Sequence, residues 1–105
     1  MFNSIEEIQQ ANKDAGYHWF DAGSMAFFDS IIYPTLVQHP EGAYFISSEK
    51  QDDRYPRFYT VRFARFTGEV NTVGPFQGFT TQEGARQYAL DHKDNWIREH
   101  SEDLS

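Results

Sequence analysis

The sequence predicts an α+β domain: a three- to four-stranded antiparallel sheet with two N-terminal helices and one C-terminal helix on one face. Three observations support this prediction. The chain of 105 residues has the length of one domain, helix-capping residues stand near both ends, and strand-forming residues separated by turns fill the middle. Helices packed on an antiparallel sheet define the α+β class. We expect one domain over residues 1–98 and an acidic, frayed tail over residues 99–105.

The N-terminal segment predicts a helix. Ser4 and Glu7 have the spacing of a capping box, in which a hydroxyl and a carboxylate satisfy free backbone N–H groups. Ile5 and Ile8 follow at helical spacing, and Gly16 is a natural end.

The next segment predicts a short helix and then a broken strand. Asp21 is a capping candidate for a helix over Ala22–Asp29, which Gly23 weakens. Residues 31–37 favour a strand, but Pro34 cannot donate a hydrogen bond to a neighbouring strand. We therefore expect an edge strand or a break at that point.

Three further strands are expected in the middle of the chain. They cover Ala43–Glu49, Arg57–Phe66 and Glu69–Phe76. A polar loop over Lys50–Pro56 joins the first two, and Thr67 with Gly68 makes a tight connection between the last two. These segments predict an antiparallel meander.

The last element is predicted to be a helix. Thr80 and Glu83 have capping-box spacing, and apolar residues such as Ala85 and Ala89 follow on one face. Aromatic side chains are expected to supply most of the core. Our core candidates are Phe20, Phe28, Phe45, Val61, Phe63, Tyr88 and Trp96.

Charge is distributed unevenly along the chain. The net charge is -7, yet residues 50–65 hold five basic and two acidic side chains. Two interpretations are open. The arginines of this segment either pair with helix carboxylates inside the fold, or form part of a bipolar surface that steers charged partners. The overall acidity argues against direct nucleic-acid binding, which favours basic domains.

Several functional classes lack a matching pattern in the sequence. Cysteine is absent, so disulfides and thiolate zinc sites are excluded, and no apolar run has the length of a transmembrane helix. We expect a cytoplasmic protein with no cofactor, no bound metal and no membrane partner. His18 and His92 are the candidates for acid–base chemistry, but neither belongs to a recognisable catalytic motif, and we expect no enzymatic activity.

Several segments together resemble a family of small proteins of unknown function encoded by bacteriophages, plasmids and other bacterial mobile elements. The resemblance extends over residues 4–90. It rests on Ala11-Asn12-Lys13 leading to Gly16, His18-Trp19-Phe20, Met25 with Phe27-Phe28, Tyr44-Phe45-Ile46-Ser47-Ser48-Glu49, Arg57 with Tyr59-Thr60-Val61-Arg62, and Thr72-Val73-Gly74-Pro75-Phe76-Gln77-Gly78-Phe79. The family implies no reaction, so no catalytic residue is transferred from it.

The resemblance implies that the chain inhibits host defence, because small acidic proteins of mobile elements often block defence complexes. The expected partner is a protein complex of the bacterial host, such as a CRISPR or restriction nuclease, bound without catalysis. Candidate contacts are Glu6, Glu7, Asp14, Asp21 and Asp29, with Asp52, Asp53 and Arg54 as a loop contact. The alternatives are a homodimeric structural or accessory phage protein, with pairing near Pro34, and a small enzyme that uses His18 or His92.

Overall fold

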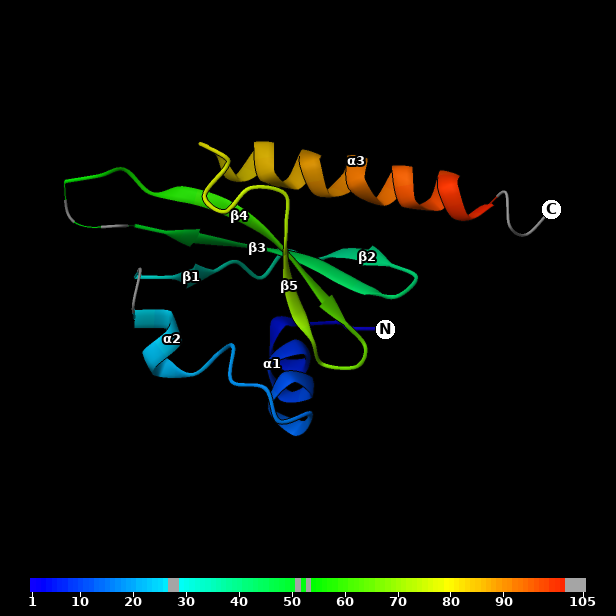
Figure 1. The fold of residues 1–105 in the computed structure, drawn as a ribbon, viewed down its shortest axis with the longest axis horizontal. Coiled ribbons are helices and arrows are strands. Elements are labelled where there is room, and N and C mark those ends of the chain that lie inside the picture. The colour runs from blue at the N-terminus through cyan, green and yellow to red at the C-terminus, as the bar shows by residue number, and fades with distance from the viewer. Residues whose placement is uncertain (27–28, 51, 53, 102–105) are drawn as a thin grey trace.

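A five-stranded antiparallel sheet with three helices forms the fold, which confirms the α+β prediction (Figure 1). The computed structural model describes residues 1–26, 29–50, 52 and 54–101. In chain order the elements are α1 (Ile5–Asp14), α2 (Ala22–Ala26), β1 (Ile31–Ile32), β2 (Val37–His39), β3 (Gly42–Glu49), β4 (Phe58–Arg65), β5 (Val70–Val73) and α3 (Gln82–Ser101).

The strand order is β1-β3-β4-β5, and β2 pairs with β3 beside β1. β1 pairs with the end of β3, where Ile31 lies opposite Ser48, and β2 pairs with its start, where Val37 lies opposite Tyr44. Pro34 lies between the two short strands, so the predicted break is confirmed.

The helices cover both faces of the sheet, and the prediction of a single helical face is wrong. α3 lies along one face, and α1 and α2 lie on the opposite side (Figure 1). Side chains alternate along β3, so Phe45 packs with the α1 residues and Tyr44 packs with the α3 residues. All eight residues of β3 are buried, as expected for a strand covered on both faces.

Each face has its own apolar core. The core on the α1 side consists of Phe2, Ile5, Ile8, Ala43, Phe45 and Ala64. The core on the α3 side consists of Val37, Tyr44, Ile46, Val61, Ala85 and Ala89. Among the core candidates, Phe45 and Val61 are fully buried. The partly buried ones are Phe20, Phe63, Tyr88 and Trp96, and Phe28 lies outside the described residues.

The ends of α1 follow the expected local chemistry. Ser4 is the N-cap, and its side chain accepts a hydrogen bond from the Glu7 N–H at 3.3 Å. The Glu7 carboxylate accepts in turn from the Asn3 N–H. Gly16, with a φ of 86°, follows the C-terminus of the helix, where a left-handed residue is favourable.

The cap of α3 is shifted by one residue from the predicted capping box. Thr81, not Thr80, accepts the hydrogen bond from the Gly84 N–H, at 3.0 Å, and the helix begins at Gln82. α3 continues to Ser101, so residues 99–101 of the predicted tail are helical, and residues 102–105 lie outside the described part.

Candidate functional site

The acidic side chains predicted to contact a partner lie mainly in one layer of the molecule. Glu6, Glu7 and Asp14 belong to α1, while Asp21 precedes α2 and Asp29 follows it. All five are exposed. We call residues 1–26 and 29–30 the acidic helical layer, which lies on the side of the sheet opposite α3 (Figure 1).

Local contacts neutralise part of this charge. The Arg57 guanidinium lies 2.8 Å from Oδ2 of Asp29 and also donates to the side chain of Ser48. Asp21 lies 3.2 Å from Nδ1 of His18. Glu6, Glu7 and Asp14 take part in none of the ion pairs between described residues. The unpaired negative charge of the layer therefore lies on α1.

The predicted loop contact is distant from the acidic helical layer in the sequence, and its described residues pair with each other. Asp52 and Arg54 pair with each other at 3.2 Å, and Asp53 lies outside the described residues. Three arginines of residues 50–65 each contact a carboxylate, namely Arg54, Arg57 and Arg62, and of these three pairs that of Arg62 is buried. Of these three pairs, only the one between Arg57 and Asp29 joins the sheet to the helical layer.

A buried charged pair lies on the same face of the sheet as α1 and α2. NH2 of Arg62 lies 3.5 Å from Oε1 of Glu49, and the two residues are 7% and 1% exposed. Thr60 donates to the same carboxylate oxygen, and Nε of Arg62 donates to Ser47 at 3.0 Å. Arg62 also donates to the Thr72 hydroxyl. We call this group the Glu49–Arg62 centre.

Two aromatic rings flank the guanidinium of the Glu49–Arg62 centre. Its central carbon lies 5.1 Å from the ring centre of Trp19 and 5.3 Å from that of Phe76. Both distances are within the range of a cation–π interaction. Burial lowers the pKa of Arg62 from its ordinary value, and the nearby carboxylate of Glu49 opposes that shift. The centre therefore holds a charge inside the fold by several simultaneous contacts.

The Glu49–Arg62 centre was not among the predicted site residues. The sequence pattern assigns Glu49 to a strand end and Arg62 to the basic segment. A signal was nevertheless present, because the centre's residues belong to the segments that carry the family resemblance. Those residues are Trp19, Ser47, Glu49, Thr60, Arg62, Thr72 and Phe76.

The opposite face carries a group of aromatic and imidazole rings beneath α3. The Tyr44 hydroxyl lies 2.6 Å from Nδ1 of His92, and burial raises the pKa of Tyr44 to about 12. His39 is buried, and the centre of its ring lies 4.8 Å from the ring centre of Phe63 and 4.5 Å from that of Trp96. His92 is thus a hydrogen-bonding partner of the core.

His18, the other histidine considered for catalysis, lies in a different setting. It is exposed, and it lines a hollow of about 540 Å³ together with Asp21, Lys13 and Tyr17. Nδ1 of His18 faces the Asp21 carboxylate, an arrangement that can orient an imidazole. Within the described part of the chain, no group of three or more His, Asp or Glu side chains has a metal-binding arrangement.

Comparisons with known proteins identify the family of this chain. Residues 4–90 match a family of unknown function, DUF7447, and the chain belongs to that family. Searches of curated proteins and of solved structures gave no match. No helix among the described residues is long and apolar enough to cross a membrane.

Proposed function

We propose that this protein binds a protein complex of a bacterial host without catalysis and inhibits it, and that its acidic helical layer is the contact surface. The carrying observation is the exposed, unpaired charge of Glu6, Glu7 and Asp14 on α1. A defence nuclease is the proposed target class, since such an enzyme needs a basic channel for its nucleic acid. The layer would occupy that channel and exclude the nucleic acid.

The charge distribution over the molecule supports this choice of face. Residues 1–30 contain five acidic side chains and one basic one, Lys13. In contrast, α3 contains four acidic and three basic side chains, so its surface is nearly balanced. A strongly acidic layer on one side speeds association with a basic surface and orients the encounter.

The test compares two charge reversals of equal size. One variant carries Glu6→Lys, Glu7→Lys and Asp14→Lys on α1, and the control carries Asp91→Lys, Asp94→Lys and Glu99→Lys on α3. Each is expressed in a bacterial strain with an active CRISPR or restriction system, which is then challenged with phage. The wild type and the α3 control should protect the phage and recover the same nuclease in a pull-down, and the α1 variant should do neither.

The α1 variant also loses a capping carboxylate, so its folding is checked by thermal unfolding. A second variant, Asp14→Lys with Asp21→Lys, leaves the helix cap intact and should also weaken the complex. Failure of the wild type to protect phage against any such system would overturn the proposed inhibition. Equal loss of binding in the α1 variant and the α3 control would overturn the assignment of the face.

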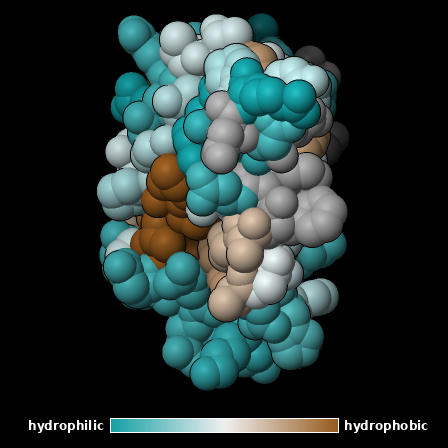
Figure 2. Space-filling view, turned by 90° about the vertical axis from the view of Figure 1, so that its left-hand side faces the viewer, coloured by the Kyte–Doolittle hydropathy of each residue, from teal (hydrophilic) through white to brown (hydrophobic). Residues whose placement is uncertain are grey.

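A homodimeric accessory protein is the second candidate, and an exposed edge strand favours it. Figure 2 shows a hydrophobic patch on the end of the molecule that lies at the left of Figure 1, where β1 is found. Ile31 of β1 is 43% exposed, and unpaired strand edges invite pairing with another chain. Light scattering would give twice the chain mass for this candidate, and Ile31→Lys should return the monomer mass.

A further inference from the structure

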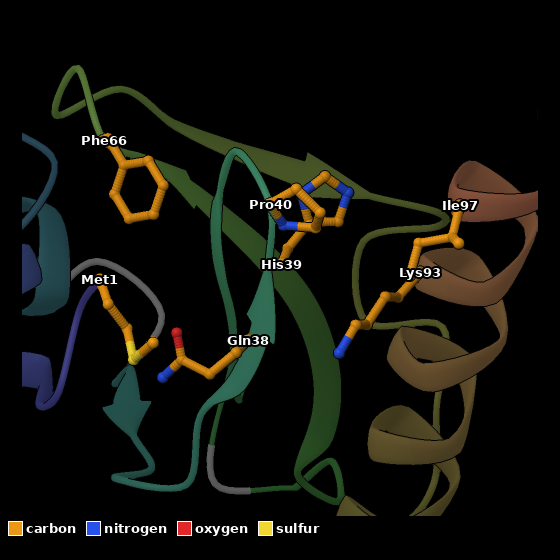
Figure 3. A pocket seen from close by; sticks show the side chains of 7 residues that line it. All are labelled: Met1, Gln38, His39, Pro40, Phe66, Lys93 and Ile97. Atoms are coloured by element: carbon orange, nitrogen blue, oxygen red, sulfur yellow. The ribbon is translucent and has the colours of Figure 1, made fainter. Parts of the chain in front are cut away.

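An open hollow lies on the molecule between the N-terminus, β2 and the C-terminal half of α3. Its volume is about 470 Å³, within the range of small-molecule sites. It is lined by Met1, Gln38, His39, Pro40, Phe66, Lys93 and Ile97. In Figure 3, Met1 and Phe66 lie on one side of the hollow and Lys93 and Ile97 on the other, with Gln38 between them.

The walls of this hollow combine apolar surface with one cationic side chain, that of Lys93. Met1, Phe66 and Ile97 are 82%, 46% and 40% exposed, so apolar surface is open to a ligand here. Lys93 is partly buried and takes part in none of the ion pairs between described residues. The remaining polar side chains are uncharged amide and imidazole groups, so the hollow favours an anion with an apolar body.

The floor of the hollow on β2 is held in place before any ligand binds. The amide of Gln38 donates to the Phe2 carbonyl at 2.7 Å. Nδ1 of His39 accepts from the Glu41 N–H at 2.9 Å, and the ring packs against Trp96. Fixed walls reduce the entropy that binding must overcome.

We propose that this hollow binds a small amphiphilic carboxylate, with the carboxylate on Lys93 and an acyl or aryl body between Met1, Phe66 and Ile97. The hollow shares only Met1 with the acidic helical layer and contains none of its acidic side chains, so the inference does not depend on the proposed function. The ammonium group supplies charge complementarity and the apolar rim supplies buried area. Cations of the same shape should be rejected.

The experiment titrates isotopically labelled protein with octanoate and follows amide shifts by NMR at constant pH. Octan-1-ol and octylammonium serve as neutral and cationic probes of the same chain length. We expect octanoate to shift amides of β2 and α3 and to bind at least tenfold more tightly than either control, as a charge-assisted hydrogen bond provides. Ile97→Ala should weaken the binding of octanoate and of octan-1-ol to a similar extent.

Two lysine variants separate a specific site from general attraction. The Lys93→Glu variant should no longer bind octanoate and should bind octylammonium instead. A merely structural role of Lys93 would not produce this reversal. Lys50→Gln removes a lysine from the loop after β3 and should leave binding unchanged. Equal affinity for octanoate and octan-1-ol, retention of octanoate by Lys93→Glu, or absence of shifts in β2 and α3 would each overturn the proposal.

Discussion

Arg62 and Glu49 place two opposite charges inside a small domain, where each depends on the other. Removing a charge from water is costly, and attraction offsets that cost only when the remaining polar atoms are also bonded. Here the hydroxyl groups of Ser47, Thr60 and Thr72 supply bonds to Oε1 of Glu49 and to the guanidinium, whereas the buried Oε2 of Glu49 has no hydrogen-bond partner among the described residues. The pair therefore fixes the relative positions of β3, β4 and β5 more than it adds net stability.

Breaking this pair should be costly, and removing both charges should cost less than the separate changes imply. Arg62→Met leaves a buried carboxylate and should reduce the free energy of unfolding by about 3–5 kcal/mol. Glu49→Met leaves a buried guanidinium and should cost a similar amount. In the double variant no uncompensated charge remains, so its cost should fall below the sum by more than about 1 kcal/mol. Urea unfolding of the four proteins measures this, and additive costs would contradict it.

His39 should make the stability of the protein depend on pH. Burial lowers the pKa of His39 below its ordinary value of 6.5, with Glu41 opposing the shift and His92, Lys93 and His100 adding to it. As the pH falls through 6.5, the unfolded chain therefore takes up the proton before the folded one, and stability decreases. Stability continues to decrease until the pH falls below the pKa of His39 in the folded protein.

The measurement compares unfolding of the wild type and His39→Asn between pH 7.5 and pH 5. Asparagine keeps an acceptor near the Glu41 N–H but does not titrate in this range. The wild type should lose more stability than the variant as the pH falls. Parallel pH profiles for the two proteins would contradict the assignment.

Residue-level prediction from the sequence succeeded where the chemistry is local. The Ser4 cap and the Gly16 end depend only on neighbouring backbone groups, and both are as expected. Arg62 could not be assigned in this way. Val61 and Phe63 were predicted core residues and both lie on the α3 side of β4, but whether the other side of that strand meets solvent depends on helices far away in the sequence.

At the scale of elements, α1 is held against the turn between β4 and β5. The amide of Asn12 donates to the Gly68 carbonyl at 2.8 Å, and its oxygen accepts from the Trp19 N–H at 3.2 Å. A Cβ atom on Gly68 would lie 2.4 Å from the Ala11 carbonyl oxygen. The helix therefore lies directly against this turn, with no room for a side chain at Gly68.

Two glycine substitutions separate the contribution of this contact from backbone strain. Gly68 and Gly16 have similar φ angles of 97° and 86°, but a Cβ on Gly16 would meet nothing within 4 Å. Gly16→Ala should therefore cost about 1–2 kcal/mol from the left-handed backbone alone. Gly68→Ala should cost clearly more, because it must also displace α1. Thermal unfolding measures both, and equal losses would show that α1 is not tightly docked.

The boundaries of the elements were predictable to within a few residues, but the side of the sheet on which each helix packs was not. The strand expected over Arg57–Phe66 is observed as β4 with each end shortened by one residue. β5 is shorter than predicted because Gly74 adopts a φ of 74° and directs the chain toward α3. Local propensity specifies strands, whereas the side on which a helix packs depends on both sheet faces being apolar.

At the scale of the whole molecule, the net charge of -7 is confined mainly to one layer and one tail. Residues 31–81, which form the sheet and its connections, contain equal numbers of acidic and basic side chains. Along the sequence, residues 50–65 form a basic segment in an otherwise acidic chain. The fold adds that the acidic N-terminal part covers one sheet face, opposite α3.

The two-sided cover of the sheet predicts a graded pattern of local stability. β3 is buried along its whole length and pairs with β4 on one edge and with β1 and β2 on the other. Its amides should open only when the whole protein unfolds. In contrast, α2 has five residues, none of them buried, and should open locally.

Native-state hydrogen exchange followed by NMR tests this gradient. Amides of β3 should exchange with an opening free energy equal to that of global unfolding, and those of β5, an edge strand, should exchange faster. Amides of α2 should exchange with only slight protection. Adding urea below the unfolding transition should lower the protection of β3 steeply and leave that of α2 nearly unchanged, because only global opening exposes much surface. If α2 were protected as strongly as β3, it would belong to the cooperative core, and the acidic helical layer would be a rigid surface along its whole length.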